Sequence, residues 1–223
     1  KNNYAPFWGV DGEKLYYTSN RTNPSEFRLY VYDFGKQKEE EIILDGEPMS
    51  RVHVSSVSRD GNKILCFGEQ KGSTLSELYY VDISERKKYQ LTKNRLQEWG
   101  GVFSPDEKWL AYTSEKDMEG SFAIYLNRFP EMNQEIRISV GGGEEPKWLP
   151  DGSAVYYRNG SKWMKVILKF DNEPEIGEPE LFFEGPYVNV PGPSHDIFPD
   201  GRILLLKGEE WVPPTEIDVI INA

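Results

Sequence analysis

Two histidines are the side chains best suited to chemistry in this sequence. His53 and His195 lie seven and five residues before an aspartate. Together with a carboxylate such as Glu144 or Glu145, two imidazoles are a common set of ligands for a transition metal. The plainer interpretation is a polar histidine hydrogen-bonded to a neighbouring loop. The sequence alone leaves both open.

Other catalytic signatures are missing. The sequence has no Gly-x-Ser-x-Gly segment of the kind that presents a nucleophilic serine. The segment "GGGEEP" (141–146) is rich in glycine, but it lacks the Lys-Ser/Thr end of a phosphate-binding loop and does not open a predicted helix. We expect a loop there. No cofactor is predicted.

Composition restricts the partners and the fold class. With 26 Lys and Arg against 37 Asp and Glu, the net charge is -11. Such a chain is poorly suited to nucleic acid or to an anionic membrane surface, and no apolar run is long enough to insert into a membrane. Aromatic residues make up 13% of the chain, with 20 Gly and 15 Pro, which favours an all-β fold. Cys66, the single cysteine, is expected to be a small buried residue on a strand.

A turn sequence recurs along the chain, and the strands beside it should position the two histidines and the nearby glutamates. Five segments align on an aspartate, with spacings of 49, 46, 45 and 49 residues: Asp11, Asp60, Asp106, Asp151 and Asp200. In the most complete copies Pro precedes the aspartate and Gly follows it. Pro fixes φ at the second turn position, Asp bonds the nearby backbone, and Gly adopts the left-handed conformation that closes a hairpin. Glu107 replaces that glycine, so we expect strain or another turn type there.

Apolar residues flank each turn at fixed positions. They lie three residues before the aspartate, and four and six residues after it. Residues two apart on a strand share a face, so each segment is predicted to be two strands with one buried face. The three sets are Trp8, Val57, Phe103, Trp148 and Ile197; Leu15, Ile64, Leu110, Val155 and Leu204; and Tyr17, Cys66, Tyr112, Tyr157 and Leu206.

Two further strands are expected in most repeats. Third strands are predicted at "RLYVYDF", "ELYYVDI", "AIYLNRF", "WMKVILK" and "EIDVIIN", and fourth strands at "EIILD", "YQLTK", "IRISV" and "ELFFE". Four antiparallel strands every 40 to 50 residues is the pattern of a β-propeller blade. We therefore predict an all-β propeller of five repeats in one domain (1–223), with repeats at about 4–50, 51–97, 98–143, 144–192 and 193–223. The alternative is part of a six-bladed or larger ring.

The motifs also resemble a known family. "FSPDEKWLAYTS" and "WLPDGSAVYYRN", followed by "IYLNRF", resemble the WD-like repeats of TolB-type propellers, including those fused to bacterial signalling kinases and regulators. The resemblance implies a β-propeller, protein partners and a periplasmic or other extracytoplasmic location, with a cytoplasmic one still open. TolB itself implies six blades.

In a propeller, the residues near the start of each first strand meet at one mouth of the central channel. We expect the following to form a rim there: Arg51, His53, Glu98, Trp99, Glu144, Glu145 and His195. Trp99 is either an anchor for a partner or a residue packed between blades.

The function predicted from this rim is a non-catalytic scaffold that binds a protein or peptide. The alternative is a metal-dependent glycan lyase or hydrolase at the channel mouth, because propeller lyases of polygalacturonate fragments use several histidines around a metal. The oligomeric state is left open.

Overall fold

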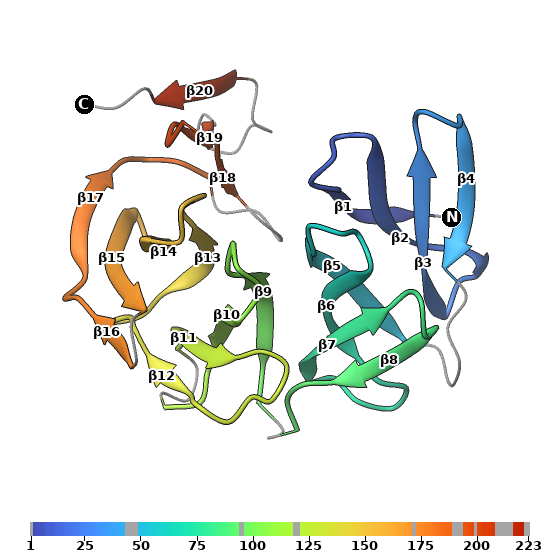
Figure 1. Ribbon diagram of the computed structural model, residues 1–223, viewed down its shortest axis with the longest axis horizontal. Helices are drawn as coiled ribbons and strands as arrows, with labels where there is room; N and C mark the ends of the chain where they lie inside the picture. The colour runs from blue at the N-terminus through green and yellow to red at the C-terminus, as the bar shows by residue number, and fades with distance from the viewer. Residues whose placement is uncertain are drawn as a thin grey trace.

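The computed structural model describes residues 2–42, 49–93, 96–117, 121–170, 173–188, 194–198 and 200–207, and the backbone of 216–220. All regular secondary structure in these residues is β-strand. The strands form separate antiparallel sheets that fan around one axis (Figure 1). The predicted β-propeller is therefore confirmed. No helix in this part of the chain has the length and apolar character needed to cross a membrane.

Each sheet corresponds to one repeat. Blade 1 contains β1 (Asn3–Trp8), β2 (Lys14–Asn23), β3 (Glu26–Asp33) and β4 (Lys38–Ile42). Blade 2 contains β5 (Arg51–Val57), β6 (Lys63–Glu69), β7 (Ser76–Asp82) and β8 (Lys87–Gln90). Blade 3 contains β9 (Glu98–Phe103), β10 (Trp109–Ser114), β11 (Ala123–Arg128) and β12 (Ile136–Arg137).

The last two blades depart from this plan. Blade 4 contains β13 (Glu144–Trp148), β14 (Ala154–Asn159) and β15 (Lys162–Phe170), and β15 pairs with two outer strands, β16 (Pro174–Ile176) and β17 (Glu180–Glu184). Only the second of these outer strands was expected. Blade 5 has three described strands, β18 (His195–Ile197), β19 (Ile203–Lys207) and β20 (Glu216–Ile220).

The first strand of each blade lies nearest the axis. β1 contacts β5, β5 contacts β9, β9 contacts β13 and β13 contacts β18. The core is divided among the seams between blades, as expected when each sheet buries its faces against its neighbours. The blade 2–blade 3 seam, for example, packs Leu65 and Leu78 against Leu110 and Tyr112, all fully buried.

The recurrent turn contains the same hydrogen bond at its tip in all five repeats. The residue after the aspartate donates its backbone N–H to the carbonyl three residues earlier, at 2.9 Å. It has positive φ each time, for example 70° at Gly61 and 59° at Glu107. The expected strain at Glu107 is therefore present. Its carboxylate Oε1 also accepts a hydrogen bond from the backbone N–H of Arg59 at 2.5 Å, which links the turns of blades 2 and 3.

The position three residues before the aspartate is buried only in the middle repeats. Val57, Phe103 and Trp148 are 5 to 8% exposed, whereas Trp8 is 53% exposed. The predicted burial is thus wrong for Trp8. Its sheet face points away from blade 2, and no other described blade packs on it.

The fifth hairpin is shifted by one residue. In the first four, the residue two before the aspartate bonds the carbonyl of the residue three after it; in the fifth, Phe198 N–H bonds the carbonyl of Arg202, only two after it. Because a one-residue shift exchanges the faces of a strand, Ile203 and Leu205 are buried against blade 4. The predicted burial of Leu204 and Leu206 is therefore wrong.

Candidate partner-binding rim

The predicted rim residues lie at the starts of four consecutive first strands. Arg51 and His53 are on β5, Glu98 and Trp99 begin β9, Glu144 and Glu145 begin β13, and His195 begins β18. Because these strands neighbour one another in order around the axis, their starts lie at one mouth of the propeller (Figure 1). The structure thus places all seven on one side, but it brings only some of them into contact.

Glu145 is the centre of a buried polar cluster. Its Oε2 accepts hydrogen bonds from the backbone N–H of Ser194 at 2.7 Å and from the Ser194 hydroxyl at 2.6 Å. The same oxygen lies 3.3 Å from Nδ1 of His195. The other oxygen, Oε1, lies 3.3 Å from Nε of Arg158. Blades 4 and 5 are therefore joined by one carboxylate.

A local irregularity directs Glu145 into this seam. The pairing of β13 with β14 shifts register between Glu144 and Lys147, and Glu145 has a φ of 57°. A bulge of this kind turns a side chain toward a site that a regular strand would not reach. The Glu145 side chain is consequently 2% exposed, while that of Glu144 is 35% exposed and lies 4.0 Å from Arg158.

Burial controls the ionisation of this cluster. Loss of water lowers the pKa of His195 below its ordinary value, and the hydrogen bond to Glu145 only partly opposes this. Burial by itself would raise the pKa of Glu145, but the hydrogen bonds from His195 and Ser194 outweigh it and the net shift is downward. The cluster is best described as an ionised carboxylate beside an arginine and a neutral imidazole.

His53 has a different environment, because β9 and β13 lie between its strand, β5, and the strand of His195, β18. Its ring stacks on Phe67, with ring centroids 5.1 Å apart. Burial, and then the charge of Arg51, lowers the pKa of His53. Arg51 is well exposed and lies 3.6 Å from Glu69. This part of the rim therefore offers an aromatic surface beside a solvated cation.

Glu98 and Trp99 complete the rim on blade 3. Glu98 is fully buried and accepts a hydrogen bond from the Ser114 hydroxyl at 3.3 Å. Trp99 is half-buried and lies between Phe67 of blade 2 and Phe122 of blade 3, with centroid distances of 6.4 and 5.9 Å. Much of this indole is used in packing between blades, while part of it faces solvent.

Comparisons with known proteins relate this architecture to solved structures. A scan against models of protein families finds no match, and neither does a search of curated proteins. The crystal structure of TolB from Acinetobacter baumannii superposes with a TM-score of 0.71 at 21% identity, over 93% of this chain and 49% of that one. The fold is that of a TolB-like β-propeller.

Other structures give the same fold at lower identity. A putative TolB from Agrobacterium tumefaciens has a TM-score of 0.63 at 17% identity. The match covers 81% of this chain and 64% of that one. An oligogalacturonate lyase in complex with manganese has a TM-score of 0.65 at 13% identity, covering 92% of this chain and 58% of that one. The TolB-like propeller therefore spans about half to two thirds of these relatives.

Because that lyase binds manganese, the question is whether side chains of this chain are placed to bind a metal ion. Within the described ranges, no three His, Cys, Asp or Glu side chains lie close enough to hold a metal ion. His195 uses Nδ1 to bind Glu145, whose other oxygen faces Arg158, and His53 is on a strand that is not adjacent to β18. The two-histidine set considered from the sequence does not fit a metal.

Sequence reasoning missed two members of the buried cluster. Arg158 lies at the end of β14 and Ser194 directly precedes His195. An arginine inside an otherwise aromatic strand was the available signal for the first of these. Nothing in the sequence pointed to Ser194, since the bulge that brings Glu145 to it is a tertiary feature.

Proposed function

We propose that this TolB-like propeller is a non-catalytic scaffold whose rim, at the starts of β5, β9, β13 and β18, binds a protein or peptide. The observation that carries the proposal is the contrast between the buried base of the rim and its exposed edge. The Glu145–Arg158–His195 cluster fixes the base, with side chains at most 4% exposed. At the same ends of β5 and β13, Arg51 and Glu144 offer charges of opposite sign to solvent, 68% and 35% exposed.

Such an edge suits recognition of another polypeptide. Tryptophan and arginine are over-represented among the residues that dominate binding energy at protein interfaces. A pre-ordered surface also loses little conformational entropy on binding. Trp99 and Arg51 provide these side chains on neighbouring blades. The TolB structures among the similar folds agree with a role in protein binding.

The arrangement of Ser194, His195 and Glu145 supports a role without catalysis. In a serine hydrolase, histidine lies between the nucleophile and the carboxylate and accepts the serine proton. Here the Ser194 hydroxyl donates to Glu145, and His195 contacts the same carboxylate oxygen. The serine hydroxyl therefore does not face an imidazole nitrogen, as a catalytic triad requires.

Under the same proposal the protein is bacterial and acts in the periplasm or elsewhere outside the cytoplasm, as its resemblance to TolB suggests. Cell fractionation with an antibody against the chain tests this part. Recovery in the cytoplasmic fraction would contradict the location and leave the binding role to its own test.

The binding role is tested with immobilised protein and extracts of the source cells. We expect partners retained by the wild type to be lost with Arg51→Glu and His53→Ala and reduced at least tenfold with Trp99→Ala. Lys36→Ala is the matched control, since Lys36 is 75% exposed in the β3–β4 turn at the opposite end of the blades. Circular dichroism verifies that each variant is folded. Equal capture by all variants would exclude the rim as the binding surface.

A further inference from the structure

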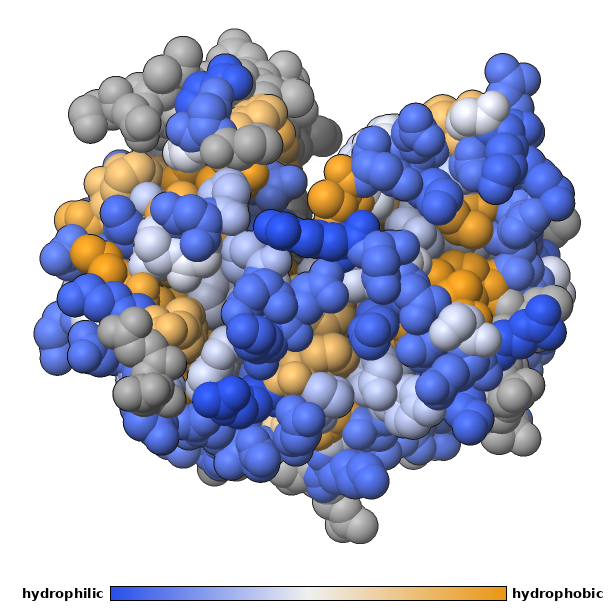
Figure 2. Space-filling model, in the orientation of Figure 1, coloured by the Kyte–Doolittle hydropathy of each residue, from blue (hydrophilic) through white to orange (hydrophobic). Residues whose placement is uncertain are grey.

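The outermost strand of blade 4 exposes large apolar side chains. β17 has the sequence "ELFFE" and pairs only with β15 among the described strands. Leu181 and Phe182 are 55% and 38% exposed. β17 lies at the outer margin of blade 4 (Figure 1), and Figure 2 shows apolar side chains along that margin, at the left of the view. One edge of β17 therefore combines backbone groups that can accept another strand with apolar side chains in water.

The pairing of β17 with β15 places these side chains on both faces of the sheet. Leu181 is paired with Met164, which packs against the core between blades 3 and 4. A register shift then leaves Phe182 without a partner on β15. The Phe182 ring contacts Tyr156 of the core between blades 4 and 5, with centroids 5.0 Å apart. A strand added beside β17 would consequently meet an apolar side chain on each of its faces.

The other outermost strands have features that prevent such pairing. β4 (KEEEI) and β8 (KKYQ) consist largely of charged residues, and β12 has only two residues. β16 begins with Pro174, which has no N–H to donate. Charges, short length and proline are the usual means by which proteins keep a sheet edge unpaired. Among the outermost strands whose side chains the structure describes, only β17 has three apolar residues in a row.

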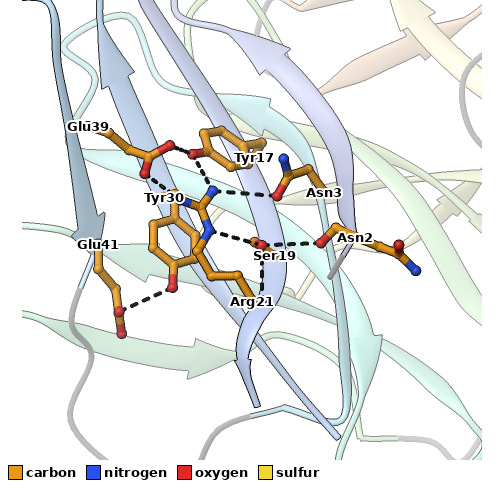
Figure 3. Close-up of polar contacts among 8 residues, drawn as sticks. All are labelled: Asn2, Asn3, Tyr17, Ser19, Arg21, Tyr30, Glu39 and Glu41. Atoms are coloured by element: carbon orange, nitrogen blue, oxygen red, sulfur yellow. Dashed lines mark hydrogen bonds and ion pairs between the residues drawn. The ribbon is translucent and has the colours of Figure 1, made fainter. Parts of the chain in front are cut away.

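In blade 1 a glutamate of the edge is bound by side chains of its own sheet. Tyr17 and Tyr30 stack with centroids 5.7 Å apart. The Tyr17 hydroxyl and Arg21 both bind Glu39 of β4 (Figure 3). This carboxylate is therefore already paired and holds a charge at the edge of the sheet.

Blade 3 fixes its edge glutamate in the same way. Tyr112 and Tyr125 stack with centroids 5.9 Å apart. The Tyr112 hydroxyl donates to Glu135, the residue before β12, at 2.5 Å, and Lys116 pairs with the same carboxylate. The edges of blades 1 and 3 thus carry charges that are bound inside their own blades.

The edge of blade 4 carries negative charge that is open to solvent. Residues 173–184 contain five Glu and no Lys or Arg. Glu178 and Glu180 are exposed, and no ion pair or side-chain hydrogen bond joins either of them to another part of the chain that the structure describes. This charge favours a partner that carries Lys or Arg.

A second copy of β17 is a poor partner for this edge. Antiparallel pairing of two copies about Phe182 would bring Glu180 of each copy opposite Glu184 of the other. Like charges directly opposite one another destabilise a pair of strands. A strand with Lys or Arg at these two positions would instead form opposite-charge pairs.

We propose that β17 is a docking edge for an extended basic segment of another protein, in which consecutive apolar residues are flanked by Lys or Arg. The segment adds to the sheet as a further strand. Its backbone pairs with the outer edge of β17, its apolar side chains cover Leu181 and Phe182, and its basic side chains approach Glu180 and Glu184. This surface is separate from the rim, which lies at the starts of the first strands.

The test uses a fluorescein-labelled peptide with Lys-Val-Thr-Val-Lys at its centre, and fluorescence anisotropy measures its binding to the full chain at physiological salt. Lys-Pro-Thr-Pro-Lys has the same charge but cannot pair as a strand, and Glu-Val-Thr-Val-Glu reverses the charge. We expect both to bind at least tenfold more weakly than the first peptide. Amide hydrogen exchange at Leu181 and Phe182 should slow with the first peptide alone.

Leu181→Lys gives β17 the kind of residue that protects β4 and β8, and we expect it to weaken binding of the first peptide at least tenfold. Val10→Lys is the matched control, since Val10 is 64% exposed on blade 1, and it should bind within twofold of the wild type. Arg51→Glu and Trp99→Ala should also bind this peptide normally, which separates β17 from the rim. Circular dichroism verifies that each variant is folded.

Three results would overturn the proposal. Equal binding of the proline peptide would show that charge acts without strand pairing. Equal binding by Leu181→Lys would place the peptide elsewhere on the molecule. A wild-type dimer that Leu181→Lys dissociates, measured by sedimentation equilibrium, would assign the edge to a second copy of the chain.

Discussion

Nδ1 of His195, on the first strand of blade 5, lies 3.3 Å from Oε2 of Glu145, on the first strand of blade 4. Arg158 approaches the other carboxylate oxygen at the same distance. The Glu145 carboxylate therefore pairs with an arginine and contacts an imidazole and a serine at the seam between blades 4 and 5. The stability of that seam should depend on the negative charge of Glu145.

Glu145→Gln should lower the free energy of unfolding by about 3 kcal/mol, because it removes the nearer and more deeply buried of the two carboxylates beside the Arg158 guanidinium. Urea denaturation measures the loss. Glu144→Gln is the control, since Glu144 is 35% exposed and 4.0 Å from Arg158, and it should cost less than about 1 kcal/mol. Equal losses would show that the pairing at Glu145 carries no special stability.

Acidification should destabilise the fold from near neutral pH. Burial lowers the pKa of both His53 and His195 below the ordinary value of 6.5. Below pH 6.5 the unfolded chain therefore binds protons that the folded chain does not, and the free energy of unfolding falls as the pH drops. The pKa of Glu145 is also lowered, so this residue contributes to the loss of stability only once the pH falls to about its ordinary pKa of 4.5.

The His53→Gln, His195→Gln double variant checks this assignment. Urea midpoints between pH 8 and pH 5 should decline in the wild type and stay nearly level in the double variant. A parallel decline in both proteins would place the acid sensitivity in other groups.

Glu107 allows the strain of a turn to be measured apart from its hydrogen bond. Glu107→Ala and Glu107→Gly both remove the bond from the Arg59 N–H, but only glycine relieves the φ of 59°. We expect the Gly variant to be more stable than the Ala variant by about 1 kcal/mol. Thermal unfolding of the pair gives this difference. An Ala variant as stable as the Gly variant would mean that the turn is not strained.

Trp8 and Trp148 have equivalent positions in their repeats and opposite exposures. Trp148→Ala should cost about 3 to 5 kcal/mol, as expected for an aromatic residue removed from a core. Trp8→Ala should cost less than about 1 kcal/mol, because 53% of the residue is already in water. Urea unfolding compares the two. Similar losses would show that the blade 1 face is covered in solution.

Much of the fold was predictable because each repeat obeys local rules. The Asp-centred turns, the face shared by Val57, Ile64 and Cys66, and the third strands follow from turn chemistry and from the two-residue period of strands. All are present in the structure. The division of the chain into a single domain of 1–223 stays a prediction.

The predictions that were wrong concern residues whose burial depends on tertiary contacts. "ILLL" in β19 is apolar on both faces, so its pattern could not report the one-residue shift that buries Ile203 and Leu205. The exposure of Trp8 depends on which blade lies beside it, and this is not a local property. The sequence predicted that Glu145 and His195 share a rim, but their contact depends on a bulge in the pairing of β13 with β14 inside blade 4, which no local pattern reports.

The stacked tyrosines of blades 1 and 3 have a consequence at high pH. Burial, followed by the hydrogen bond to Glu39, raises the pKa of Tyr17 from 10.0 to about 12, and burial raises that of Tyr112 as well. Above pH 10 an unfolded chain releases phenolic protons that the folded chain retains, so alkali favours unfolding. These two tyrosines therefore set an upper pH limit for the stability of the fold.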